Sequence, residues 1–76
     1  MEDRILIDPN VCHGKPVVKG TRVLISNILS SLANGESIED ILKEYPNISK
    51  EDVYAAIAFG SRLSNFESSS YDVKVS

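Results

Sequence analysis

Apolar residues recur at helical spacing in two stretches of the second half of the chain, and this pattern constrains the fold more than any other feature. Positions i, i+3, i+4 and i+7 are filled first by Ile25, Ile28, Leu29 and Leu32, and again by Ile38, Ile41, Leu42 and Tyr45. Gly35 ends the first stretch and Pro46 ends the second. Ser37 and Ser49 each precede an aspartate by three positions, a pattern related to the capping box. We therefore expect three helices, the third running to about Ser64.

The N-terminal third has a different pattern and predicts a β-hairpin. Arg4 to Ile7 is a short apolar run closed by Asp8-Pro9-Asn10, a strong turn signal. A second bend is expected at Gly14, after which Pro16 to Val18 returns as another short strand. Two strands of this size are not stable alone. The hairpin must lie on the helices or pair with a second chain.

The third helix carries apolar residues over more than half of its circumference. One stripe contains Val53, Ala56, Ile57 and Gly60, and the other contains Ala55, Phe59, Leu63 and Phe66. Either this helix is the central core helix of a monomer, or its second stripe is covered by a partner subunit. A small chain with one cysteine cannot form an internal disulfide, and pairing with a copy of itself adds buried surface. We expect a homodimer with Phe59, Gly60 and Leu63 in its interface.

The C-terminal end is expected to lie outside the folded domain. Residues 1–64 form the single predicted domain, and residues 65–76 form a flexible tail that begins with a serine-rich stretch. The last residues alternate apolar and charged, as in an extended segment. We interpret the tail as a segment that binds a partner protein by ordering on it, with a frayed terminus as the alternative. Its candidate contact residues are Phe66, Tyr71, Val73, Lys74 and Val75.

Composition and charge limit the classes of function. Apolar residues make up 42% of the chain and charged residues 25%, as in ordinary globular domains. The start of the chain resembles neither a signal peptide nor a membrane span, so we expect a cytoplasmic protein in which Cys12 is reduced and buried or half-buried. The net charge of −3 argues against a general nucleic-acid binder.

The distribution of charge leaves a local nucleic-acid site open. Residues 10–22 hold three cations and no acid, whereas residues 36–54 hold six acids and two lysines. The positive segment lies just before the first helix, whose N-terminus favours anions. The candidate contacts to a nucleic-acid backbone are Lys15, Lys19, Thr21 and Arg22. The alternative is that these residues shape the junction between the hairpin and the helix.

No arrangement of residues indicates catalysis. The sequence has one histidine, no zinc-binding pattern and no nucleophile elbow. The glycines at positions 14 and 20 do not fit a phosphate-binding loop, because Gly20 is followed by Thr21 and Arg22 instead of a lysine and a hydroxyl residue. We therefore expect a binding protein that is not an enzyme, with no cofactor and no metal site.

The helices around Pro46 have the spacing of a helix-turn-helix, preceded by a helix from about Leu24 to Asn34. The first turn of the third helix presents Glu51 and Asp52, and these carboxylates have the wrong sign for contact with DNA. The usual recognition helix is therefore expected to be disabled.

The chain resembles the prokaryotic domain-of-unknown-function family number 433. The segments that carry the resemblance include Asp8-Pro9, the run from Cys12 to Arg22, Gly35-Glu36-Ser37 and Ala55-Ala56-Ile57. The resemblance covers residues 5–63, and the string Gly-Lys-Pro-Val-Val-Lys-Gly-Thr-Arg is its most specific part. The family usually has a glycine before Gly14, where this chain has His13, a change that a turn can tolerate.

The resemblance implies a mainly α fold: a short N-terminal β-hairpin followed by a homeodomain-like, three-helix bundle of the helix-turn-helix type, often dimeric. For many members it also implies an antitoxin of a bacterial or archaeal toxin-antitoxin pair, encoded beside a PIN-like ribonuclease. This leads to our functional hypothesis, a regulator that binds such a toxin through its tail and operator DNA through its basic end. The alternative is a dimeric protein-interaction module with no DNA-binding role.

Overall fold

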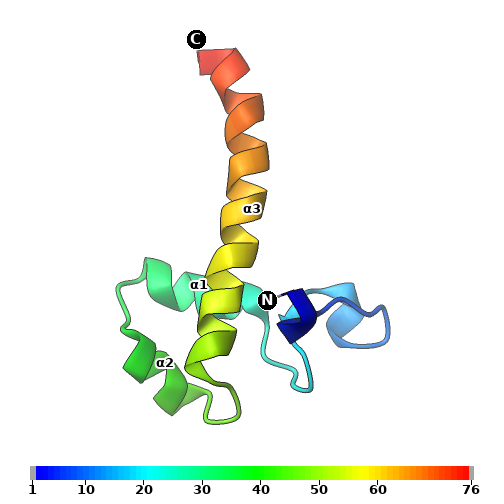
Figure 1. Ribbon diagram of the computed structural model, residues 1–76, viewed down its shortest axis with the longest axis vertical. Coiled ribbons are helices and arrows are strands. Elements are labelled where there is room, and N and C mark those ends of the chain that lie inside the picture. The colour runs from blue at the N-terminus through cyan, green and yellow to red at the C-terminus, as the bar shows by residue number, and fades with distance from the viewer. Residues whose placement is uncertain (1, 76) are drawn as a thin grey trace.

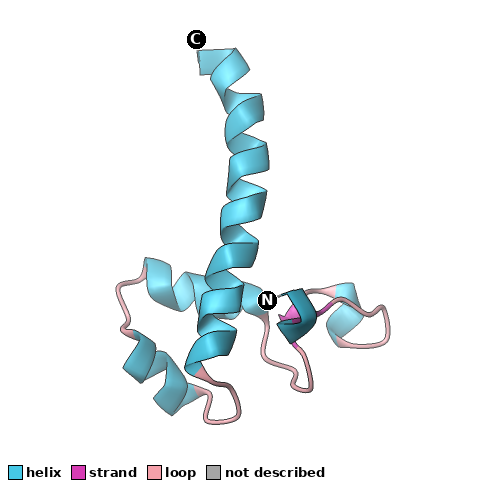
Figure 2. Ribbon diagram, in the orientation of Figure 1, coloured by secondary structure: helices cyan, strands magenta, loops and turns pink. Residues whose placement is uncertain are grey.

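The protein is a helical body from which the last helix projects (Figures 1 and 2). The computed structural model describes the backbone of residues 2–75 and the side chains of residues 3–63. The elements in chain order are η1 (Glu2–Arg4), β1 (Ile5–Leu6), η2 (Cys12–Gly14), β2 (Val17–Val18), α1 (Ile25–Ala33), α2 (Ile38–Glu44) and α3 (Lys50–Val75). The expected hairpin followed by three helices is confirmed.

Strands β1 and β2 form a two-stranded antiparallel sheet in which Ile5 pairs with Val18 and Leu6 with Val17. The free side of β2 is also occupied, because Val17 forms a bridge with Leu24. Both valines of β2 are buried. The predicted hairpin is therefore extended by the segment that leads into α1.

The loop between the strands contains a left-handed turn at η2. Cys12, His13 and Gly14 all have positive φ, at 49°, 58° and 81°. The turn is closed by hydrogen bonds from Gly14 N–H to Val11 C=O (3.1 Å) and from Lys15 N–H to Cys12 C=O (3.1 Å). Glycine adopts this left-handed conformation without steric cost, whereas histidine adopts it less readily. The position where the resembling family carries glycine is thus one that favours glycine.

Helices α1 and α2 begin and end where the sequence predicts. Gly35 has φ +89° and donates its N–H to Leu32 C=O (3.0 Å), which closes the end of α1. At the start of α2 the Ser37 hydroxyl accepts a hydrogen bond from Asp40 N–H (3.1 Å). Both the C-cap at Gly35 and the N-cap at Ser37 are therefore confirmed.

The start of α3 is tied to the N-terminal segment through Asp52. One carboxylate oxygen of Asp52 accepts from the N–H and the hydroxyl of Ser49 (2.9 and 3.1 Å), while the Ser49 hydroxyl accepts from Asp52 N–H. The other oxygen lies 3.1 Å from a guanidinium nitrogen of Arg4. The predicted cap thus also holds η1 against α3.

The predicted end of the third helix near Ser64 is wrong. Helix α3 continues to Val75, through the segment predicted as a linker and an extended strand. No glycine or proline follows Gly60, so nothing in the sequence stops a helix that is already nucleated, and each added residue costs little. The division into a domain of residues 1–64 and a tail of residues 65–76 remains a prediction.

The core lies where α1, α2 and the first half of α3 meet the β-ribbon. Its fully buried side chains include Ile25, Ile28, Ile41 and Val53. Half-buried Leu29 and Phe59 pack against this cluster. At Gly60 the helices approach so closely that an added Cβ would lie 2.9 Å from a methyl carbon of Leu29. The close approach predicted at Gly60 therefore occurs within the chain, against α1.

The contact at Gly60 predicts that its effect on stability depends on Leu29. In the wild type, Gly60→Ala should stabilise by less than the roughly 1 kcal/mol that alanine regains in helix propensity, because the Leu29 methyl must move to admit the added Cβ. In a Leu29→Ala background the same change should stabilise by about 1 kcal/mol. Urea denaturation of the four proteins measures this coupling, and equal effects in the two backgrounds would contradict the packing.

The left-handed turn predicts an unusual tolerance to glycine. His13→Gly should leave stability unchanged or raise it by up to about 1 kcal/mol, because relief of the left-handed conformation offsets the greater entropy of unfolded glycine. The matched control is Lys15→Gly, at φ −75°, which should lose about 0.5–1 kcal/mol. Thermal melts compare the two, and a similar loss at both positions would show that His13 is not strained.

Candidate functional site

The last part of the predicted basic segment, residues 19–22, is a tight turn between β2 and α1. Val18 N–H donates to Val23 C=O (2.9 Å) and Thr21 N–H donates to Val18 C=O (3.0 Å), with Gly20 at φ +84°. Lys19 and Arg22 are exposed on this turn. Their backbone positions are fixed by hydrogen bonds on both sides of the turn.

Thr21 has a structural role in the same turn. Its hydroxyl donates to Val18 C=O (2.8 Å) and accepts from Val23 N–H (3.0 Å). The hydroxyl is half-buried and shapes the junction between hairpin and helix, as the structural alternative predicted. Its assignment as a contact to nucleic acid stays a prediction.

Lys15 comes from the neighbouring turn and is also exposed. The two turns touch through Cys12, whose Sγ lies 3.9 Å from the carbonyl oxygen of Arg22. Cys12 is a free, half-buried cysteine, in agreement with the prediction from the sequence. The structure therefore brings the loop before Lys15 against the turn that carries Arg22.

The first turn of α3 is less negative than its sequence suggests. Asp52 is half-buried, and both of its oxygens are engaged by Ser49 and Arg4. Glu51 and Lys50 are exposed beside it. One of the two acids that were expected to disable a recognition helix is thus part of the fold, while Glu51 remains at the surface.

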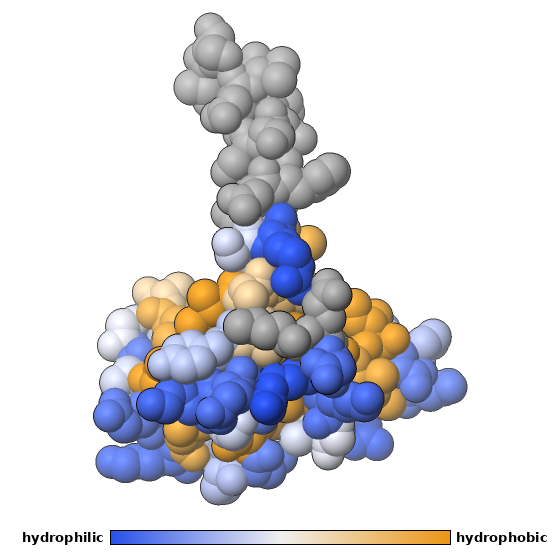
Figure 3. All heavy atoms as spheres, viewed as in Figure 1, coloured by the Kyte–Doolittle hydropathy of each residue, from blue (hydrophilic) through white to orange (hydrophobic). Residues whose placement is uncertain are grey.

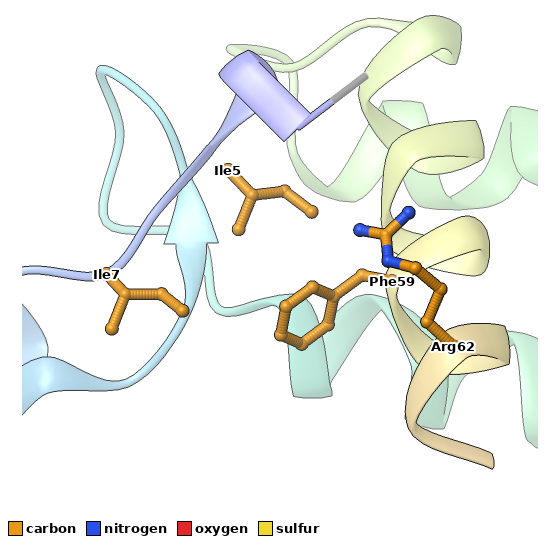
Figure 4. A pocket seen from close by; sticks show the side chains of 4 residues that line it. All are labelled: Ile5, Ile7, Phe59 and Arg62. Atoms are coloured by element: carbon orange, nitrogen blue, oxygen red, sulfur yellow. The ribbon is translucent and has the colours of Figure 1, made fainter. Parts of the chain in front are cut away.

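A surface hollow lies between β1 and α3, at residues that the sequence analysis did not bring together. It has a volume of about 170 Å³ and is lined by Ile5, Ile7, Phe59 and Arg62 (Figure 4). Ile7 and Leu63 are highly exposed for apolar residues, at 58% and 53%. Figure 3 shows apolar surface over the N-terminal ribbon and beside the base of α3. The short apolar run Ile5-Leu6-Ile7 was the signal available in the sequence.

A second hollow lies between α2 and α3. It is lined by Ile38, Glu39, Leu42, Lys50 and Tyr54. One anion and one cation border it, so its charge favours neither sign. Within residues 3–63, no three histidine, cysteine or carboxylate side chains are grouped as metal ligands. None of the helices, over the residues described, is both long and apolar enough to cross a membrane.

The predicted dimer contacts and toxin contacts all belong to α3. Phe59 is half-buried on the core and borders the first hollow, whereas Leu63 is exposed one turn further along α3. Gly60 faces Leu29 of its own chain and needs no second copy to explain it. The tail residues Phe66, Tyr71, Val73, Lys74 and Val75 lie beyond the described side chains.

Comparison with known proteins gives consistent matches. The family model described as "Protein of unknown function (DUF433)" matches residues 5–60. The uncharacterized protein y4eO of Sinorhizobium fredii (strain NBRC 101917 / NGR234) is 38% identical over 48 residues, which are 63% of this chain and 22% of that protein. The chain therefore matches about a fifth of that relative's length.

A solved structure shares the fold. It is a crystal structure of a DUF433 member from Anabaena variabilis ATCC 29413, with a TM-score of 0.74 and 26% identity. The alignment covers 80% of this chain and 60% of that one. The ribbon, the turn with its cations and the first half of α3 all lie within the matched family segment. The chain is therefore a member of the DUF433 family.

Proposed function

We propose that this protein is an antitoxin-type regulator, which binds operator DNA through the β2–α1 turn, pairs as a homodimer and inhibits a PIN-like ribonuclease. The observation that carries the DNA-binding part is that Lys15, Lys19 and Arg22 are exposed on two turns that touch through Cys12 and Arg22. The toxin-binding part rests on what the family resemblance implies. The chain has a net charge of −3, so a segment of 13 residues (10–22) without an acid stands out from the rest.

The proposed mode of DNA binding differs from that of an ordinary helix-turn-helix. Exposed Glu51 in the first turn of α3 opposes insertion of this helix into the major groove. The β2–α1 turn instead offers cations immediately before α1, where the partial positive charge of the helix N-terminus adds to the attraction for phosphate. Contacts of this kind position a protein on DNA and carry little sequence information.

Toxin binding is assigned to the C-terminal end of α3, from Phe66 to Val75. An extended segment would place Tyr71, Val73 and Val75 on one face, whereas the backbone of α3 is helical over these residues. Two features still support the assignment. Among residues 3–63 the core cluster includes no residue beyond Phe59, and Lys74 supplies a cation suited to a nuclease's metal-binding carboxylates.

The second candidate function is a dimeric protein-interaction module with no role in DNA binding. It is favoured by exposed Ile7 at a hollow that Ile5 and Phe59 also line, because contiguous exposed apolar surface marks protein-binding sites. It also fits the net negative charge. The two candidates differ in whether the cations of the turn contact a ligand.

The DNA-binding proposal predicts a specific response to charge reversal. Lys19→Glu combined with Arg22→Glu should abolish binding to the DNA upstream of the protein's own gene, without unfolding the protein. The matched control, Lys43→Glu with Lys50→Glu, changes the net charge by the same amount within the acidic segment, residues 36–54. This variant should bind the DNA almost normally.

Fluorescence anisotropy across a range of salt concentrations measures the effect. Three cations from each of two copies would neutralise up to about six phosphates and give a log-log salt slope of about −5. Undetectable binding by the wild type at about 50 mM salt, where electrostatic binding is strong, would favour the interaction module.

The toxin-binding proposal predicts that a chain ending at Ser64 stays folded but no longer inhibits its nuclease. All core residues identified among residues 3–63 lie at or before Phe59, so the truncated chain retains them. Co-expression with the adjacent PIN-like nuclease, followed by co-purification and a ribonuclease assay, tests this. Full-length Tyr54→Ala, altered at an exposed residue of the body, is the control and should inhibit normally. Unchanged inhibition by the truncated chain would move the toxin site onto the body.

A further inference from the structure

The outer edge of β1 is open for pairing. Lys19 N–H donates to Arg4 C=O (2.8 Å), and Leu6 is paired with Val17, so alternate residues of this strand direct their backbone groups toward β2. By the same alternation, the backbone N–H and C=O of Ile7 and the C=O of Ile5 point away from β2. Within residues 3–63, the N–H and C=O of Ile7 and the C=O of Ile5 form no backbone hydrogen bond. An edge of this kind is a template for another strand.

The sequence of β1, taken with the flanking residues Arg4, Ile7 and Asp8, is complementary to itself. Residues 4–8 read Arg-Ile-Leu-Ile-Asp, with a cation at one end, an anion at the other and three apolar residues between them. If two such strands run antiparallel and are centred on Leu6, Ile5 lies opposite Ile7 and Arg4 lies opposite Asp8. The apolar residues then pair with each other, and both pairs of opposite charges meet. Opposed charges and apolar cross-strand pairs each stabilise a sheet.

A hollow beside this edge can accommodate a side chain from a partner. Ile5 and Ile7 project toward Phe59 and Arg62 of α3 and border the hollow of about 170 Å³ (Figure 4). An apolar cavity of about 150 Å³ can hold a molecule as large as benzene, so this hollow has room for one apolar side chain. Ile7 itself is 58% exposed and needs such cover. Hollow and projecting residue thus lie on one patch, as a twofold interface requires.

We propose that two copies of this chain pair through β1, antiparallel and centred on Leu6, to form a continuous four-stranded sheet in the order β2–β1–β1–β2. Ile7 N–H of each copy donates to Ile5 C=O of the other, and each Ile7 side chain is covered at the mouth of the opposite hollow. Strand addition of this kind gains affinity from main-chain bonds and specificity from pockets for alternate side chains. The inference rests on the homodimer of the proposed function and names the surface that forms it.

The existing contacts of the two charged residues are compatible with this pairing. Arg4 already contacts Asp52, but its side chain is 45% exposed and a guanidinium has five N–H donors. One oxygen of Asp8 accepts from Asn10 N–H (2.8 Å), and a carboxylate can accept several more bonds. Each group can therefore bind within its own chain and across the twofold axis at once.

Sedimentation with a matched pair of lysine variants tests the surface. Ile7→Lys should weaken dimerisation about ten-fold or more, because a lysine on an edge strand prevents pairing. Ile57→Lys introduces the same change at an isoleucine that is 41% exposed on α3, and should dimerise like the wild type. A wild type that remains monomeric at about 100 µM, or equal weakening by both variants, would overturn the proposal.

Disulfide trapping tests the register. In a Cys12→Ser background, Leu6→Cys should oxidise rapidly to a covalent dimer, because the residue at the centre of the pairing faces its own copy across a non-hydrogen-bonded pair, with Cα atoms about 4.5 Å apart. Ile7→Cys is more exposed but lies opposite Ile5, so it should cross-link more slowly. Faster cross-linking at position 7 than at position 6 would exclude this register.

These results separate the inference from the proposed function. If Leu63→Glu abolishes the dimer while Ile7→Lys does not, pairing occurs along α3 and the β1 interface is excluded. Loss of DNA binding in Lys19→Glu with Arg22→Glu, with the dimer intact, supports the regulator whichever surface pairs. A β1 dimer without DNA binding leaves the interface established and removes the regulatory function.

Discussion

The fold depends on the double pairing of β2. Its two valines are hydrogen-bonded to β1 on one side and to the segment around Leu24 on the other, and both side chains are buried. This pairing satisfies the backbone in the interior and brings the N-terminal third over the helices. It also determines where α1 begins, since Ile25 N–H donates to Pro16 C=O (3.0 Å). Without β2, neither the ribbon nor the start of the first helix would have a fixed position.

Asp52 makes a second long-range connection. It caps α3 through Ser49 and contacts Arg4, 48 residues earlier in the chain. The Asp52 side chain is 13% exposed and both of its oxygens are engaged, whereas Arg4 is 45% exposed, so solvent still screens the ion pair in part. The same carboxylate that looks unfavourable for DNA recognition in the sequence therefore holds the two ends of the body together.

Local signals in the sequence were sufficient for the helix starts and the turns. Ser37, Gly35 and Pro46 act through their own backbone neighbourhood, so their consequences can be derived without knowledge of the fold. The end of α3 could not be derived in this way, because serines are poor helix formers but do not stop a helix. Gly60 illustrates another limit. Its close packing was predictable from its place in a helix, but its partner, Leu29, is fixed only by how α1 crosses α3.

The candidate site was likewise predictable only in part from local sequence signals. The positive segment was visible as a run without acids, but only the structure shows that the hydroxyl of Thr21 belongs to the turn and that Cys12 joins the two basic turns. The hollow beside β1 combines residues more than 50 positions apart, such as Ile7 and Arg62, and no local pattern connects them. The hydrogen bond from Val18 N–H to Val23 C=O also fixes the number of residues in the β2–α1 turn. One inserted residue between Val18 and Val23 would shift the pairing register and exchange the inner and outer faces of the following segment. Homologous chains should therefore keep this turn at one length, with insertions and deletions confined to other loops.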